Sequence, residues 1–111
     1  HGDMWRDFTF IDDIVAGVIA ALDLPPDGDA PHRVYNLGNH RCEKLVDFIA
    51  EIECAMGRKA QIRYEPMQLG DVAKTYADIS ESQRDLDFQP KTSIAEGIPR
   101  FIAWFKEYHG L

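Results

Sequence analysis

Apolar residues recur three and four positions apart in three stretches of the chain, which is the spacing of one face of an α-helix. The first stretch begins at Asp12 or Asp13, whose carboxylates suit a helix start, and reaches about Leu24. The second ends at Gly57, and glycine adopts the left-handed conformation that ends many helices. The sequence therefore predicts three amphipathic helices, defined by Ile14, Val15, Val18, Ile19 and Leu22; Leu45, Phe48, Ile49, Ile52 and Met56; and Ile98, Phe101, Ile102, Phe105 and Tyr108.

Two segments have the serine and Glu/Gln spacing of a helix capping box, Ser80–Gln83 and Ser93–Glu96. The first predicts a short helix to about Asp87, and the second predicts the start of the closing helix. Pro99 follows six positions after Ser93 and lacks the N–H that a helix interior uses. We therefore expect a kink at Pro99 or a helix that starts close to it, with the closing helix packed on the sheet.

Alternating polar and apolar residues predict a first strand over Arg6–Ile11 and a later one over 61–65. Residues 34–37 and 75–78 also favour short strands. The order strand, helix, strand over 34–65 indicates a right-handed βαβ unit with parallel neighbours. We expect an α+β fold, in which a small mixed, partly parallel sheet packs with helices, as one domain over residues 1–111.

Composition narrows the function classes. Twelve Lys and Arg against nineteen Asp and Glu give a net charge of -7, which disfavours a nucleic-acid partner. No run reaches the roughly 18 apolar residues of a membrane span, and no signal sequence opens the chain, so we expect a cytoplasmic protein. The two cysteines have no CxxC pattern, so we expect neither a metal site nor a disulfide. Because the chain lacks an initiator Met, we expect a fragment of a longer one.

Few residues are candidates for chemistry. The four histidines lie near the termini or in predicted loops, without a recognisable nucleophile beside them. Asp12 and Asp13 are interpreted as helix caps. The chain has no glycine-rich Gly-x-Gly-x-x-Gly or P-loop sequence, so it lacks the usual phosphate cradle for NAD. The polar residues that secondary structure leaves unexplained are Arg6 and the segment 68–71, and both could face one ligand.

The order of several short motifs resembles the extended short-chain dehydrogenases/reductases of the NAD-dependent epimerase/dehydratase family, most of all the UDP-glucuronate 4-epimerases. The resemblance covers nearly the whole chain. It rests on Arg6–Ile14 (RDFTFIDDI), Val34–Gly38 (VYNLG), Pro66–Val72 (PMQLGDV), Thr75–Asp78 (TYAD) and Gln89–Ile94 (QPKTSI).

The resemblance implies a role for three residues. Arg6 would contact the nucleotide diphosphate, for which a guanidinium supplies a fixed fork of donors. Asp71 would accept hydrogen bonds from the ribose hydroxyls. Gln68 would be a further ligand contact and is neutral, so Arg6 is the main countercharge. The alternatives are an ion pair of Arg6 with a nearby carboxylate and a purely turn-forming role for Asp71; a shared pocket requires both residues on one face.

For the complete protein, the resemblance implies a homodimeric NAD-dependent epimerase that acts on a UDP-sugar. NAD and a catalytic Tyr-x-x-x-Lys pair would belong to an N-terminal Rossmann domain that this chain lacks, so we expect the isolated chain to bind no NAD and to be inactive. A nucleotide-sugar dehydratase, decarboxylase or reductase of the same family is an alternative. A stand-alone, non-catalytic interaction or binding module is an alternative of another class.

Overall fold

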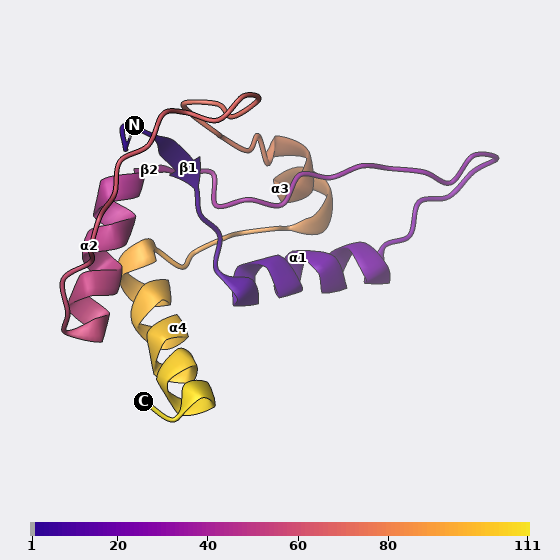
Figure 1. The fold of residues 1–111 in the computed structure, drawn as a ribbon. Coiled ribbons are helices and arrows are strands. Elements are labelled where there is room, and N and C mark those ends of the chain that lie inside the picture. Colours follow the sequence, from indigo (N-terminus) through magenta and orange to yellow (C-terminus); the bar gives the residue numbers. More distant parts are fainter. Residues whose placement is uncertain (1) are drawn as a thin grey trace.

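The computed structural model describes residues 2–111 as four helices and one two-stranded sheet, which confirms an α+β fold (Figure 1). No helix in this range is long and apolar enough to cross a membrane. In chain order the elements are β1 (Trp5–Asp7), α1 (Ile11–Asp23), β2 (Cys42–Lys44), α2 (Leu45–Met56), α3 (Ser80–Leu86) and α4 (Ile94–His109).

The sheet is antiparallel, so the prediction of a partly parallel sheet is wrong. β1 pairs with β2 in the register Trp5↔Lys44, Arg6↔Glu43 and Asp7↔Cys42. Neither 34–37 nor 61–65 forms a strand, and the expected βαβ unit is absent from the described residues. Residues 75–78 form no strand either; the neighbouring Lys74 makes one parallel bridge with Trp5.

Side chains of α3 explain why residues 34–37 remain irregular. The Ser82 hydroxyl donates to the Asn36 carbonyl at 2.7 Å, and the Asn36 amide donates to the Asp78 carbonyl at 3.1 Å. Since these contacts satisfy polar groups of the segment, a neighbouring strand is not required.

The first helix occupies the predicted range, but its start differs from the prediction. Phe10 is the N-cap residue and makes no side-chain capping bond. The Asp13 carboxylate instead accepts hydrogen bonds from the N–H groups of Lys91 and Thr92, at 3.3 and 2.9 Å. A capping role for Asp13 is therefore wrong, because this carboxylate joins α1 to the segment that precedes α4.

The other helices follow their local signals in most respects. Gly57 ends α2 in the left-handed conformation, with φ 69°. The Ser93–Glu96 capping box starts α4, which continues through Pro99, so the helix does not begin near that proline. The box predicted at Ser80 does not form, because Ile79 is the N-cap of α3.

The closing helix packs against α2, where the Lys106 ammonium donates to the Ala55 carbonyl at 3.1 Å (Figure 1). The expected packing of this helix on the sheet is replaced by packing of one helix on another. A separate small core, formed by Ile79, Leu86 and Phe88, lies where α3 meets α1.

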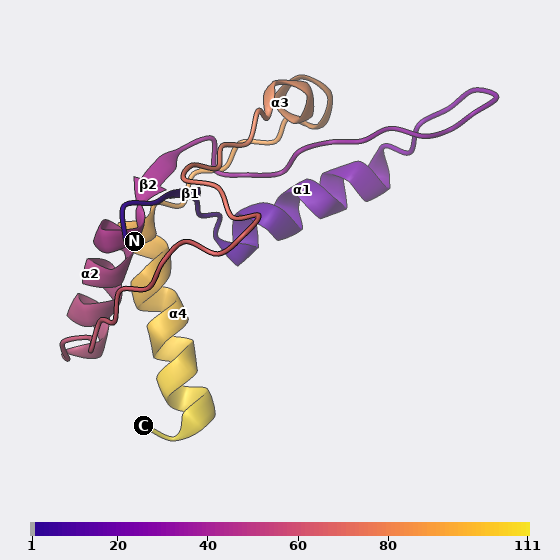
Figure 2. The same cartoon turned by 45° about the horizontal axis from the view of Figure 1, so that its top comes forward.

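The chain is extended for its length. Its radius of gyration is 17.1 Å, whereas a compact domain of this size has about 13 Å. Figure 2 shows α1 and the loop after it projecting away from the pair formed by α2 and α4. Much apolar surface consequently stays open, including most of the stripe expected to bury α1.

Candidate functional site

The segment Gln68–Asp71 forms a tight turn that presents a carboxylate. The Asp71 N–H donates to the Gln68 carbonyl at 3.2 Å, and Gly70 has φ +88°, which a type II turn requires at its third residue. The Asp71 carboxylate also accepts from the N–H of Val72 at 2.9 Å. Glycine therefore holds this loop in a conformation that points Asp71 back toward the strand.

Arg6 meets that turn from β1. One terminal nitrogen of its guanidinium lies 2.7 Å from a carboxylate oxygen of Asp71, and the other donates to the Trp5 carbonyl at 2.9 Å. The side chains of Arg6 and Asp71 are 21% and 40% exposed, so solvent and solutes reach the pair. The structure thus brings together two of the three predicted site residues, on one face and in direct contact.

This contact is also the alternative anticipated for Arg6, an ion pair with a carboxylate. Gln68 is exposed, and its backbone carbonyl closes the turn. Lys44 and Lys74 are the backbone partners of Trp5 on its two sides, next to Arg6. The Lys44 ammonium lies 5.1 Å from the centre of the Trp5 ring, and side chains alternate between the two faces of a strand, so Lys44 lies on the face opposite to Arg6.

Asp7 is a structural residue of the site that the sequence analysis quoted only as part of a motif. One carboxylate oxygen accepts from the Asn39 N–H at 2.7 Å, and the other accepts from the Ala77 N–H at 3.2 Å. Its own N–H donates to the Thr75 hydroxyl at 3.2 Å. Asp7 therefore fixes β1, which carries Arg6, to the segment that follows Asp71. The available signal was an acid placed between Arg6 and Phe8 in the first motif.

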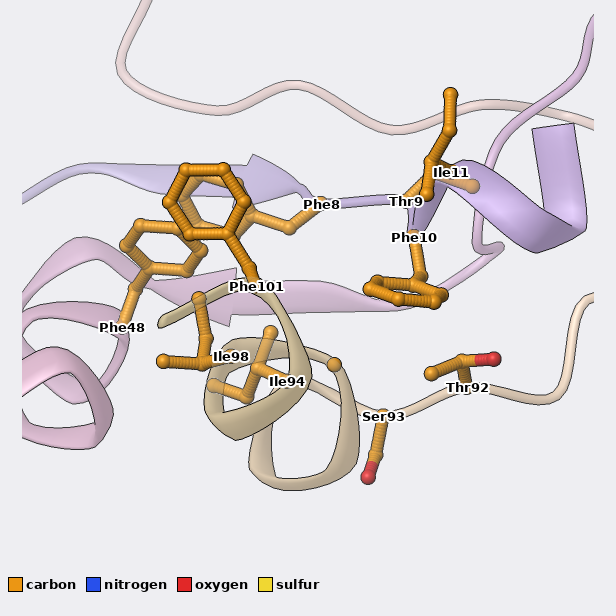
Figure 3. Close-up of a pocket in the computed structure, with 11 residues that line it drawn as sticks. Phe8, Thr9, Phe10, Ile11, Phe48, Thr92, Ser93, Ile94, Ile98 and Phe101 are labelled. Carbon is orange, nitrogen blue, oxygen red and sulfur yellow. The ribbon is translucent and has the colours of Figure 1, made fainter. Parts of the chain in front are cut away.

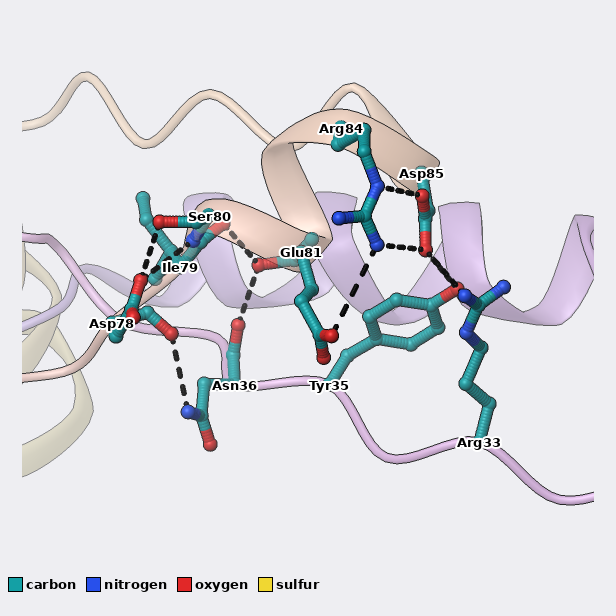
Figure 4. Close-up of polar contacts among 10 residues, drawn as sticks. Arg33, Tyr35, Asn36, Asp78, Ile79, Ser80, Glu81, Arg84 and Asp85 are labelled. Atoms are coloured by element: carbon teal, nitrogen blue, oxygen red, sulfur yellow. Dashed lines mark hydrogen bonds and ion pairs between the residues drawn. The ribbon is translucent and has the colours of Figure 1, made fainter.

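A second polar cluster joins the segment 33–36 to α3 (Figure 4). The carboxylate of Asp85 pairs with Arg84 at 2.7 Å and Arg33 at 3.2 Å, and accepts from the Tyr35 hydroxyl at 3.1 Å. The hydrogen bond from Arg84 is the main cause that lowers the pKa of Asp85, while burial and Asp85 raise the pKa of Tyr35. Asp85 thus stays ionised and Tyr35 protonated near neutral pH, as a structural clamp requires.

An apolar hollow of about 320 Å³ lies between the segment 8–11, α2 and the start of α4. Figure 3 shows Phe8, Phe48, Phe101 and Ile98 around it, and the rings of Phe8 and Phe48 stack at 4.0 Å. It contains none of the predicted site residues. Because its lining has no charged side chain and only the hydroxyls of Thr9, Thr92 and Ser93 as polar side-chain groups, it does not suit a nucleotide diphosphate.

The glycines of the described residues do not form a dinucleotide cradle. Those with positive φ, apart from Gly70, are Gly2, Gly28, Gly57 and Gly110, which lie far apart in the sequence. None belongs to a glycine-rich turn between a strand and a helix. The described residues therefore contain no glycine-rich phosphate cradle of the dinucleotide-binding kind.

Comparison with known proteins gives long and specific matches, although no family model matches the chain. The chain is 38% identical to the protein CapI of Staphylococcus aureus, over 98% of this chain and 37% of that protein. It is also 38% identical to UDP-glucuronate 4-epimerase 4 of Arabidopsis thaliana, over 98% of this chain and 27% of that enzyme. The chain thus spans about a third of the curated relatives that it matches.

A solved structure extends the likeness to the fold. UDP-glucuronic acid 4-epimerase from Bacillus cereus, in complex with UDP-glucuronic acid and NAD, is 29% identical and superposes with a TM-score of 0.83. The match covers 96% of this chain and 33% of that one. The resemblance read from the motifs is therefore confirmed: this chain is similar, in sequence and in fold, to the C-terminal third of UDP-glucuronate 4-epimerases.

Proposed function

We propose that this chain is the substrate-binding part of an NAD-dependent nucleotide-sugar epimerase of the UDP-glucuronate type, and that it holds the nucleotide diphosphate. The observation that carries the proposal is the contact of Arg6 with Asp71 at 2.7 Å, made by two motifs 65 positions apart. A partly exposed guanidinium beside a carboxylate can bind a diphosphate and its ribose together. The epimerases among the relatives favour this reaction over the dehydratase, decarboxylase and reductase alternatives.

Binding of a nucleotide diphosphate would exchange the partners of Arg6 and Asp71. In the structure Arg6 is neutralised by Asp71. A diphosphate carries more charge than one carboxylate and can accept both arms of the guanidinium, so it would displace Asp71 from Arg6. The released carboxylate would then be free to accept hydrogen bonds from the ribose hydroxyls.

The remaining steps of catalysis are assigned to other parts of the complete protein. NAD would supply a hydride acceptor when bound to a Rossmann domain outside this chain. The residues described above would bind and orient the nucleotide. Binding of this part of the substrate, which does not react, would position the reacting sugar. A homodimeric, cytoplasmic enzyme remains a prediction for the complete protein, as does the inactivity of the isolated chain.

Replacing Arg6 by alanine in the complete gene product is expected to weaken UDP binding by about 1.5–3 kcal/mol, the range for hydrogen bonds to a charged group. Isothermal titration calorimetry with UDP measures this difference. The matched control is Arg63→Ala, since Arg63 is 86% exposed and pairs with Glu65. Unchanged UDP affinity in Arg6→Ala would remove Arg6 from the site.

Replacing Asp71 by asparagine tests the exchange of partners. Inorganic pyrophosphate has no ribose, so loss of the competing carboxylate should tighten its binding about 2- to 5-fold, as expected for breaking a partly exposed ion pair. UDP should gain less, because the ribose loses a charged acceptor. Titrations of both ligands give the ratio, and weaker pyrophosphate binding in Asp71→Asn would contradict the exchange.

A further inference from the structure

The arm of Arg6 that contacts Asp71 has a second neighbour, the thioether of Met4, which lies two residues earlier in the chain. The Nη2 nitrogen of Arg6 donates to Asp71 at 2.7 Å and lies 4.0 Å from the Met4 sulfur. This nitrogen carries two N–H groups, so the carboxylate takes one and the sulfur faces the other. Because a thioether is a weak acceptor, the second N–H stays available to a stronger one.

Backbone hydrogen bonds fix Met4 in this place. Its carbonyl accepts from the Leu45 N–H at 2.9 Å, and the N–H of the next residue, Trp5, donates to the Ala73 carbonyl at 2.9 Å. The Met4 side chain is half-buried, so small solutes can reach its sulfur. The thioether is therefore held beside Arg6 and is open to a small reagent.

Oxidation would change what this sulfur offers to Arg6. A lone pair of the sulfur attacks one oxygen of hydrogen peroxide, the O–O bond breaks, and after proton transfer the products are methionine sulfoxide and water. The sulfur loses two electrons, and the peroxide is reduced by them. The new S–O group is polar, with its negative end on oxygen, so it accepts hydrogen bonds that the thioether accepts only weakly.

The distance between the sulfur and Nη2 suits capture of the sulfoxide oxygen by Arg6. An oxygen bonded to the sulfur on the side of Arg6 lies inside the 4.0 Å gap, where little movement brings it to the roughly 2.7–3.2 Å of an N–H···O hydrogen bond. The donor is charged, which strengthens the bond. Both N–H groups of Nη2 would then have strong acceptors, Asp71 and the sulfoxide.

We propose that Met4 is an oxidation site whose sulfoxide is held by Arg6, and that this modification lowers the affinity for a diphosphate. The effect on affinity rests on the proposed function, whereas the capture by Arg6 rests on the geometry alone. A diphosphate would have to displace two strong acceptors from Nη2 in place of one. Enzymatic reduction of the sulfoxide returns the thioether, so the effect is reversible.

Titrations with inorganic pyrophosphate, before and after peroxide treatment of the complete gene product, test the effect on binding. The wild type is compared with Met4→Leu and with the control Met67→Leu, since Met67 is 41% exposed and precedes the turn that carries Asp71. Mass spectrometry follows oxidation at each methionine. We expect affinity to fall about 3- to 10-fold, the size of one net hydrogen bond, in the wild type and in Met67→Leu, and to stay constant in Met4→Leu. Methionine sulfoxide reductases should restore the lost affinity.

An equal loss in Met4→Leu, or unchanged affinity in wild-type protein that is oxidised at Met4, would overturn the effect on binding. Thermal unfolding tests the capture without a ligand: oxidation at Met4 should lower Tm more in Arg6→Ala than in the wild type, because only the wild type offers the sulfoxide a charged donor. Equal drops in Tm would overturn the capture. Pyrophosphate binding that Arg6→Ala leaves unchanged before oxidation would refute the proposed function and leave the capture intact.

Discussion

Replacement of Phe88 by alanine is expected to lower the free energy of unfolding by about 3–5 kcal/mol, the range for removing a buried aromatic side chain. Phe88 is 3% exposed and belongs to the core cluster with Ile79 and Leu86. Its ring also lies against Gly17 of α1. Since this core contains few other large side chains, little neighbouring material could refill the cavity, and urea denaturation followed by circular dichroism measures the loss.

Tyr108→Ala is the control for this change. Tyr108 is 72% exposed near the end of α4, so its truncation should cost less than about 1 kcal/mol. Equal destabilisation by the two variants would mean that the buried cluster around Phe88 does not stabilise the fold.

The helices could be predicted because their limits are encoded locally. Gly57 supplies the left-handed residue after α2, and the Ser93–Glu96 box marks the start of α4. Even so, the faces of α1 could not be assigned from periodicity. Its large residues were expected to face the core, but the core accepts only Gly17 and small side chains, so Val18 and Leu22 lie outward.

The strands could not be predicted in the same way, because pairing depends on distant partners. β2 has the sequence CEK, which is too short to show the alternation of polar and apolar residues that predicts a strand. Its partner β1 lies more than thirty residues earlier in the chain. The segment 34–37 has the composition of a strand, but the Tyr35 side chain donates to Asp85 of α3 and the Asn36 side chain donates to the carbonyl of Asp78, before α3.

The resemblance led us to expect Arg6 and Asp71 on one face, and the structure places the two side chains in a direct ion pair. The proposed function requires in addition that a diphosphate displaces Asp71 from Arg6. Two acids that organise the surroundings were misinterpreted or overlooked. Asp13 was read as a helix cap, because an acid at a helix start usually is one, and the role of Asp7 depends on amides far away in the sequence.

Replacement of Asp13 by alanine is expected to lower the free energy of unfolding by about 2–4 kcal/mol. Asp13 is 6% exposed, and one of its oxygens accepts from the N–H groups of Lys91 and Thr92. Alanine would leave these two donors without their acceptor, and a buried unpaired donor costs about 1–3 kcal/mol. The same change would release the segment before α4 from α1, so unfolding should be followed by chemical denaturation.

The adjacent acid provides a matched control within the same turn of α1. Asp12 pairs with Arg100 at the surface, where both side chains are more than half exposed. An exposed ion pair contributes about 0–1 kcal/mol, so Asp12→Ala should have a small effect although it removes the same charge from the same helix start. If both acids acted as caps or through the helix dipole, the two variants would be destabilised alike. A large difference requires instead that Asp13 acts through its hydrogen bonds to the backbone of Lys91 and Thr92, which follow α3 in the sequence.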